Sequence, residues 1–351
     1  TMIDFIIVGN GLAGISFAEI ALQNNKSIFV FDNNSQPSSR VAGGLYNPVV
    51  LKRFSEVWKA KEQIDFAFPL YHEIQSKLNV VFDFELPILR KLYSVEEQNN
   101  WFQAADKPNL APFLDAKLVT SSYESIQSPF HYGKVNHTGY LEISTLIEAY
   151  SNYLKSLNSF SNEGFHYNEI EFLDNGIQYK DIKAKHIIFA EGFGLHANPY
   201  FNDLPLDGTK GELLIIKAPN LDLDVVIKSS VFILPIGNDL YKVGATYDWK
   251  DKTNTPTEEG KQELVNKLKE IISCDFEIVE HFGGVRPTVK DRRPLVGTHP
   301  EFKQLHVLNG LGTRGVMLGP YLANQLFQHI ENNIPLEKEI DIIRCYKKNR
   351  N

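Results

Sequence analysis

The distribution of apolar and polar residues over the first 32 positions predicts a β-α-β unit. Residues 3–8 form a short continuous apolar run, which is typical of a buried parallel strand. A helical stretch follows to about residue 22, because Ile15, Ala18 and Leu22 fall on one face of a helix. Residues 27–31 then form a second apolar segment. Strand, helix and strand therefore follow one another at the spacing of a nucleotide-binding unit.

The same patterns predict the remaining elements of the chain. A helix is predicted at residues 58–78, and Pro69 is expected to kink or break it. Helical spacing recurs four times after this segment. The stretch between residues 211 and 248 has strand character throughout, with Gly237-Asn238 as a hairpin turn. The predicted helices are 58–78, 96–105, 143–157, 257–272 (with Thr257 as N-cap) and 316–330, and further strands are 80–93, 187–190 and 305–308. We expect an α/β fold, with a Rossmann-like domain and a second domain built on an antiparallel sheet.

The length of 351 residues favours two domains. We place a discontinuous nucleotide domain at residues 1–80, 136–205 and 276–351, and a substrate domain at 81–135 and 206–275. The net charge of −7 offers no overall attraction to nucleic acid or anionic lipid. No stretch of about eighteen apolar residues indicates a membrane span. Two cysteines argue against a disulfide framework, so we expect a cytoplasmic protein, whose oligomeric state the sequence leaves open.

A glycine motif, Gly9-Asn10-Gly11-Leu12-Ala13-Gly14, connects the first strand to the first helix. In such a motif the first glycine permits the tight turn, the second lets the backbone approach a pyrophosphate, and the third lets helix and sheet pack closely. Asp32 ends the second strand, where it would accept hydrogen bonds from ribose hydroxyls, with Asn33 beside it. These residues predict a dinucleotide site but do not separate FAD from NAD.

Three further segments resemble the D-amino-acid oxidase and glycine oxidase family of flavoenzymes. They are Ser39-Arg40-Val41-Ala42-Gly43-Gly44-Leu45, then Gly283-Gly284-Val285-Arg286-Pro287-Thr288 with Asp291-Arg292-Arg293-Pro294-Leu295-Val296-Gly297, and finally Asn309-Gly310-Leu311-Gly312-Thr313-Arg314-Gly315-Val316. The stretches 44–48, 244–247 and 312–315 are similar to the oxidase half of a bifunctional tRNA wobble-uridine enzyme. The resemblance implies FAD as cofactor. It extends the expected cofactor-binding residues beyond Gly9, Gly11, Leu12, Ala13, Gly14, Asp32 and Asn33 to Arg40, Gly43, Gly44, Leu45, Ile170, Ala190, Glu191, Gly192, Arg286, Gly312, Thr313, Arg314, Gly315 and Val316.

The resemblance also implies three catalytic-site residues: Arg286, Arg314 and Tyr247. An arginine at position 286 would hold the substrate carboxylate through two parallel hydrogen bonds, although an isolated arginine is often a structural ion-pair partner. Where glycine oxidase-like proteins have a tyrosine, this chain has Phe232, which cannot donate a hydrogen bond. Tyr46, Tyr241 and Tyr247 are candidate substitutes, against the alternative that each packs in the core.

We therefore expect oxidation of the C–N bond of a small amino acid or N-substituted glycine, by hydride transfer to the flavin, with oxygen as the electron acceptor. One alternative is the same chemistry on carboxymethylaminomethyl-uridine in tRNA. Others are a flavin-binding protein without amine turnover and a nicotinamide-dependent dehydrogenase. Four histidines, His131, His137, His281 and His299, lack metal-ligand spacing, so we expect no metal.

Overall fold

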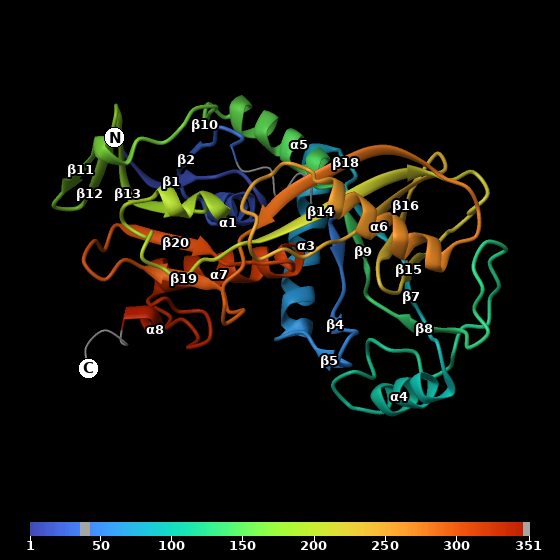
Figure 1. Cartoon of the computed structure of the whole chain (residues 1–351). Helices are drawn as coiled ribbons and strands as arrows, with labels where there is room; N and C mark the ends of the chain where they lie inside the picture. Colours follow the sequence, from blue (N-terminus) through green and yellow to red (C-terminus); the bar gives the residue numbers. More distant parts are fainter. Residues whose placement is uncertain (36–42, 347–351) are drawn as a thin grey trace.

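The computed structural model describes residues 1–35 and 43–346. Within this part of the chain, two sheets form separate layers, with the eight-stranded sheet in the left half of Figure 1 and the seven-stranded sheet in the right half. The helices α1 (Leu12–Gln23), α3 (Ala60–Leu78), α5 (Ile143–Ser156) and α7 (Gly315–Asn332) pack on one another beside the first sheet. The α/β fold with a second, antiparallel layer is confirmed.

The eight-stranded sheet has a parallel centre that contains the predicted β-α-β unit. Strand β1 (Met2–Val8) pairs in parallel with β2 (Ile28–Phe31) and with β13 (Ile182–Phe189). The remaining strands are β10 (Phe160–Ser161), β11 (Ile170–Leu173), β12 (Gly176–Tyr179), β19 (Leu295–Thr298) and β20 (Leu305–Asn309). Phe5, Ile7 and Ile188 are fully buried. Burial on both faces explains why these strands read as continuous apolar runs.

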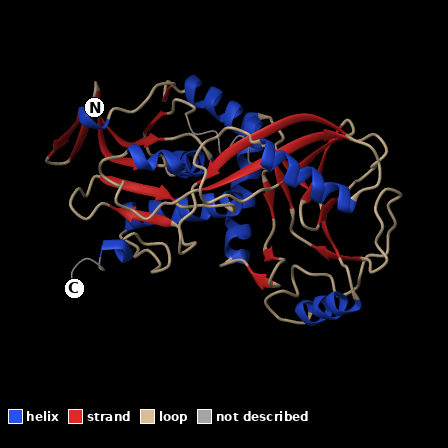
Figure 2. Cartoon of the chain, viewed as in Figure 1, coloured by secondary structure: helices blue, strands red, loops and turns tan. Residues whose placement is uncertain are grey.

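The seven-stranded sheet runs in the order β18-β14-β17-β16-β15-β7-β8. Its strands are β18 (Glu277–Arg286), β14 (Thr209–Lys217), β17 (Leu240–Gly244), β16 (Phe232–Gly237), β15 (Val226–Lys228), β7 (Ile88–Lys91) and β8 (Tyr132–Val135). All pairs in it are antiparallel except β15 with β7. Helix α6 (Glu258–Ile271) covers one face, where Leu264 and Leu268 pack with Leu214 and Val243 (Figure 2). The other face is left for the functional cavity.

The remaining elements are short or lie at the edges. Two small sheets contain β3 (Leu45–Tyr46), β6 (Asp83–Glu85) and β9 (Gly139–Leu141), and β4 (Val49–Val50) with β5 (Ser55–Glu56). The other helices are α4 (Val95–Ala105), α8 (Ile343–Tyr346), and the 3₁₀ turns η1 (Tyr167–Glu169) and η2 (Gly192–Ala197). In the described part of the chain, no helix is both long and apolar enough to span a bilayer.

One expectation about local structure differs from the observed fold, and another is confirmed. Helix α3 continues through Pro69 without a break, and α7 likewise contains Pro320. The N-cap of α6 is confirmed, because the Thr257 hydroxyl accepts a hydrogen bond of 3.0 Å from the Gly260 backbone N–H.

The pairing of strand β18 bears on the predicted domain boundary at residue 276. Strand β18 was assigned to the nucleotide domain, but it pairs with β14 along its length and so belongs to the seven-stranded sheet up to Arg286. Its Gly283-Gly284 pair lies within this ladder, because ladder hydrogen bonds come from the backbone and need no side chain. The division into two domains otherwise stays a prediction.

Candidate functional site

A cavity of about 310 Å³ lies between the glycine-rich loops of the first layer and the open face of the seven-stranded sheet. Its walls bring together segments that are far apart in the sequence. Most of the residues predicted from the sequence line it: Gly11, Leu12, Ala13, Gly43, Gly44, Leu45, Ala190, Gly192, Tyr247, Arg286, Gly312, Thr313, Arg314, Gly315 and Val316. One cavity therefore contains both the expected cofactor loops and the expected catalytic residues.

The first glycine loop is closed by contacts that exclude any side chain. Gly9 has φ +111°, and a Cβ atom there would lie 2.1 Å from the Ala190 carbonyl oxygen. A Cβ on Gly14 would lie 2.0 Å from the Gly9 carbonyl oxygen. These two glycines shape the turn from behind, while Gly11 to Ala13 face the cavity. Helix α1 begins there without a side-chain cap or an acidic residue in its first turn, so its N–H groups remain available to phosphate oxygens.

A second helix N-terminus opens into the same cavity. Helix α7 begins at Gly315, again without a side-chain cap or an acidic residue in its first turn. The loop before it contains Gly312, whose φ is +61° and whose absent Cβ would meet nothing within 4 Å. A planar ring can therefore approach this backbone closely, with the positive end of the helix dipole directed at it. Two uncapped helix N-termini in one cavity fit a flavin dinucleotide, with one at the pyrophosphate and one at the pyrimidine end of the ring.

The other predicted cofactor residues lie outside the cavity wall. Asp32 is half-buried at the end of β2, and Asn33 is exposed beside it. Ile170 begins β11, and its side chain packs with Ile6 and Phe31 in the core of the first layer. Arg40 falls outside the described residues. The structure thus does not bring Ile170 to the cavity, because β11 is the outer strand of a hairpin at the edge of the sheet.

Glu191 follows β13 and supports the cavity from behind its wall. It accepts hydrogen bonds from the Tyr167 hydroxyl and, at 2.9 Å, from the Asn198 side-chain amide. Burial raises the pKa of this carboxyl from 4.5 to about 7, and the two hydrogen bonds oppose that rise. Glu191 therefore has a supporting position next to Ala190 and Gly192, which do line the cavity.

Arg286 ends β18 and directs its guanidinium over β14. A Cβ on Gly211 would lie 2.1 Å from its Nη2 atom, so the side chain uses space that only glycine leaves open. Nη2 donates to the Thr246 carbonyl oxygen at 3.2 Å, whereas Nη1 is buried without a partner. Burial lowers the pKa of Arg286, and the nearby Tyr247 opposes this shift. A buried guanidinium with an unpaired N–H group, in a residue that lines a cavity, is suited to an anionic ligand.

Arg314 also lines the cavity, and its side chain joins two of the loops around it. Its Nη1 atom donates to the Asn47 carbonyl oxygen at 2.9 Å, and this bond joins the start of α7 to the segment after β3. Burial lowers the pKa of Arg314. Tyr247 opposes this shift, and the positive charge of Arg53 adds to it. Its side chain therefore reaches into the protein and contacts backbone, which the sequence had left open.

The tyrosine candidates occupy three different environments. Tyr247 lines the cavity, is 65% exposed, and has its ring centre 4.5 Å from the Arg286 guanidinium carbon. The Tyr46 hydroxyl donates to Asp83 at 2.6 Å, and the Tyr241 hydroxyl accepts from the Leu223 backbone N–H on the α6 face of the sheet. Phe232 lines the cavity, as its alignment with the family's tyrosine predicted. Among these three tyrosines, Tyr247 has the position closest to the predicted carboxylate anchor.

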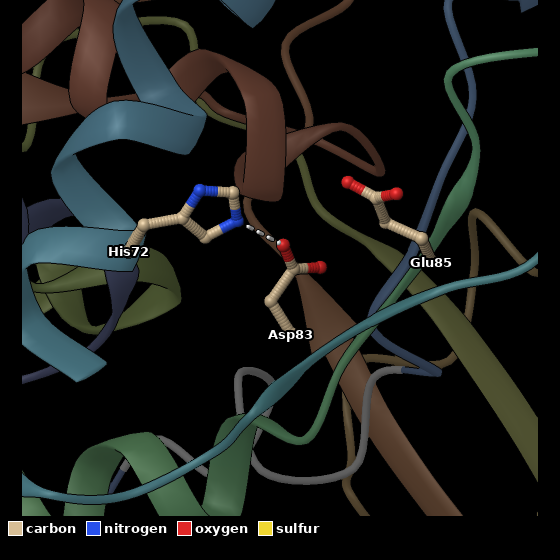
Figure 3. Close-up of side chains that lie close together, drawn as sticks. All are labelled: His72, Asp83 and Glu85. Carbon is tan, nitrogen blue, oxygen red and sulfur yellow. Dashed lines mark hydrogen bonds and ion pairs between the residues drawn. The ribbon is translucent and has the colours of Figure 1, made fainter. Parts of the chain in front are cut away.

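Tyr46 belongs to a hydrogen-bonded chain that reaches the surface. Asp83 accepts a hydrogen bond from the Tyr46 hydroxyl through Oδ1, and its Oδ2 contacts His72 Nε2 at 2.9 Å. Glu85 lies near His72 and Asp83 but is bonded to neither of them (Figure 3). His72, Asp83 and Glu85 are close enough together to be considered as metal ligands. Both Asp83 oxygens already have partners, however, so the observed geometry is that of a support for β3. The expected absence of a metal stays a prediction.

Lys228 is a cavity residue that the sequence analysis did not identify. It ends β15, lines the cavity beside Phe232, and is mostly buried. Burial lowers its pKa, and the charge of Arg90 lowers it further. The alternation of side chains along a strand could have identified Lys228. Because Ile227 packs in the core under α6, the next residue, Lys228, faces the other side of the sheet.

Together, the dinucleotide turn, the two helix N-termini and the facing antiparallel sheet define an FAD-dependent oxidoreductase. The sequence profile of the DAO family, described as FAD dependent oxidoreductase, matches residues 4–328. The chain belongs to this family, and its cofactor is FAD.

Individual relatives are distant but match along most of the chain. A glycine oxidase from Bacillus subtilis is 22% identical over 344 residues, which span 90% of this chain and 89% of that protein. The tRNA 5-methylaminomethyl-2-thiouridine biosynthesis bifunctional protein MnmC of Marinobacter nauticus is 21% identical over 97% of this chain, which covers only 58% of that protein. Among solved structures, glycine oxidase from Bacillus cereus aligns with a TM-score of 0.79 and 17% identity, covering 96% of this chain and 99% of that one. Iminodiacetate oxidase from Chelativorans aligns with a TM-score of 0.78 at 17% identity, covering 96% and 98%. These structural likenesses show a shared fold.

Proposed function

We propose that the protein oxidises the C–N bond of a small amino acid or N-substituted glycine. The observation that carries this proposal is the Arg286 guanidinium, which is buried in the cavity wall with Nη1 unpaired. No Asp or Glu is among the described residues that line this cavity. A carboxylate from the substrate would supply the missing charge and hydrogen-bond acceptor. The glycine oxidase and iminodiacetate oxidase relatives carry names that fit an amine substrate with a carboxylate.

The chain's own residues would position this substrate. Arg286 would hold the carboxylate, and Gly211 provides the space into which the guanidinium extends. Phe232 offers an apolar surface where a tyrosine would have offered a hydroxyl, so the amine must be oriented mainly by its carboxylate and by shape. FAD, when bound, accepts the hydride from the carbon next to the nitrogen. The substrate loses that hydride and an N–H proton and becomes an imine, which water hydrolyses, and oxygen is the proposed final acceptor.

Anaerobic reduction of the flavin tests this proposal. The FAD-loaded protein is mixed with glycine, sarcosine or D-amino acids without oxygen, and the visible flavin absorbance is recorded. We expect one of these amines to bleach the flavin. Arg286→Lys should raise the amine concentration needed for half-maximal bleaching by roughly 100-fold, because a lysine cannot form two parallel bonds to a carboxylate. Arg293→Lys, on an exposed side chain of the same segment, is the matched control and should behave as wild type.

The outcomes separate the proposal from its alternatives. A flavin that is bleached equally well in wild type and Arg286→Lys would overturn the role of Arg286. A flavin that resists every small amine but is bleached by tRNA carrying carboxymethylaminomethyl-uridine would favour the second candidate, which the match to MnmC along this chain supports. A flavin that resists both would leave a flavin-binding protein without amine turnover.

A further inference from the structure

The open face of the seven-stranded sheet carries a row of side chains that ends in a lysine. Register pairs Leu213 with Gly244, Gly244 with Phe232, and Phe232 with Lys228. Directly paired residues project to the same face of a sheet. Leu213, Phe232 and Lys228 all line the cavity. Lys228 is therefore part of the same cavity floor as the phenylalanine that replaces the family's tyrosine.

Lys228 has a positive neighbour and no paired acid. Arg90 is its register partner on β7. The Arg90 Nη2 atom contacts Glu97 at 3.3 Å, but its Nη1 atom is buried without a partner, and its guanidinium carbon lies 5.2 Å from the Phe54 ring centre. Among the described residues, no carboxylate forms an ion pair with Lys228. Arg90 thus has Glu97 as its acidic partner, whereas Lys228 has none among the described residues, which is unfavourable for a half-buried lysine unless an anion joins it.

Lys228 lies on a strand well separated from the one that the Arg286 guanidinium covers. The Arg286 guanidinium lies over Gly211 on β14, and Lys228 lies on β15, with β17 and β16 between these two strands. Three steps between neighbouring strands correspond to a distance of roughly 14 Å between the backbones. Anchoring points at this backbone separation suit a substrate longer than glycine. A longer substrate with acidic groups at both ends can contact both cations.

The cofactor phosphates do not explain this lysine. The glycine turn and the start of α1 belong to the other sheet, across the cavity from β15. The wall contains Arg286, Arg314 and Lys228 and, among described residues, no acid, although the whole chain has a net charge of −7. A positive cavity in an acidic protein selects for anionic ligands.

We propose that Lys228, with Arg90 beside it, forms a second anion-binding subsite for the distal acidic group of the substrate. This inference rests on the proposed function and specifies its substrate class. The substrate is then an amino acid or N-substituted glycine whose far end carries a carboxylate or a phosphate. Arg286 holds the carboxylate next to the reacting carbon, and Lys228 sets the length and charge that the cavity accepts.

Ligand titration tests the subsite without any turnover. The FAD-loaded protein is titrated with acetate, glutarate, suberate and 3-phosphonopropionate, and binding is followed by the change in flavin absorbance. We expect at least one of the two-ended anions to bind at least 10-fold more tightly than acetate. In Lys228→Gln this preference over acetate should fall to about 3-fold or less, and Lys228→Arg should restore it. Lys217→Gln, on an exposed lysine of β14, should keep the wild-type preference.

The same variants in a kinetic assay complete the test. An N-substituted glycine with a distal carboxylate and its distal amide are compared as substrates, and Lys228→Gln should abolish the preference for the acid through KM. Equal preferences in Lys228→Gln and Lys217→Gln would overturn the subsite. If no amine is oxidised, the proposed function fails, yet the titration still decides whether Lys228 binds an anion. Comparing the affinities for glutarate and suberate with the affinity for 3-phosphonopropionate distinguishes a distal carboxylate from a distal phosphate.

Discussion

The guanidinium carbon of Arg286 lies 4.5 Å from the centre of the Tyr247 ring, which forms the outer side of the same cavity. Tyr247 is 65% exposed, so its ring covers a buried cation from the solvent side. A ring face in this position stabilises the positive charge and limits the directions in which the guanidinium can turn. The relationship assigns Tyr247 to positioning through its ring, while the hydroxyl is not required for it.

Tyr247→Phe and Tyr247→Leu separate the ring from the hydroxyl. We expect Tyr247→Phe to retain near wild-type KM for a carboxylate amine. Tyr247→Leu should raise KM about 5-fold, because an exposed cation–π contact contributes about 1 kcal/mol. Steady-state kinetics measures both. An equal loss in the two variants would instead identify the hydroxyl as the functional group.

Gly14→Ala should prevent formation of the FAD site. The new Cβ would lie 2.0 Å from the Gly9 carbonyl oxygen, so helix α1 must move away from the turn. We expect the purified variant to contain less than about a tenth of the wild-type FAD, since the pyrophosphate contacts depend on this close approach. Gly319→Ala is the control, because its Cβ would meet α1 at an ordinary 3.6 Å. Retention of full FAD content by Gly14→Ala would contradict the assignment.

Arg314→Met should weaken FAD binding without abolishing it. The variant loses the 2.9 Å hydrogen bond to the Asn47 carbonyl, which joins two loops of the cofactor cavity. A charged hydrogen bond contributes about 1.5–3 kcal/mol, so the Kd for FAD should rise about 10- to 100-fold. Quenching of FAD fluorescence on titration with apoprotein gives this constant. Arg293→Met, on an exposed side chain, should leave the Kd unchanged.

Glu191→Gln should stabilise the protein at alkaline pH. The raised pKa of Glu191 means that the folded protein holds a proton between about pH 4.5 and 7 that the unfolded chain has released. The free energy of unfolding therefore falls as the pH rises through this interval. The total fall is about 3 kcal/mol, because each unit of pKa shift corresponds to 1.36 kcal/mol. Glutamine can accept from the Asn198 amide through its oxygen and donate to the Tyr167 hydroxyl oxygen through its NH2 group, and it remains uncharged.

Thermal unfolding at pH 5 and pH 8, with FAD in excess, measures this effect. The Tm of Glu191→Gln should exceed that of wild type at pH 8 and match it at pH 5. A variant that is less stable than wild type at pH 8 would show that the charged form of Glu191 is the stabilising one.

The cofactor half of the site could be predicted from the sequence, whereas much of the substrate half could not. Gly9, Gly11 and Gly14 follow a local pattern in which neighbouring residues build the turn. Lys228 and Gly211, by contrast, acquire their roles from strand pairing across the sheet, and pairing between distant segments is not encoded locally. Likewise, the end of the substrate layer at Arg286 depends on the pairing of β18 with β14.

The interleaving of the two layers bears on how the protein acquires its active state. Strands of the seven-stranded sheet come from residues 88–135, 209–244 and 277–286. Between the first two of these segments the chain returns to the other sheet, and between the last two it forms α6. Contacts of such large sequence separation form slowly, and partly assembled sheets expose strand edges. The cavity is closed only when the last crossing, from β18 to β19, has been completed. Arg286 at the end of β18 and Pro287 at the start of this crossing both line the cavity. We therefore expect the proposed substrate anchor to be placed only when both layers have formed, since neither layer is one continuous segment of the chain.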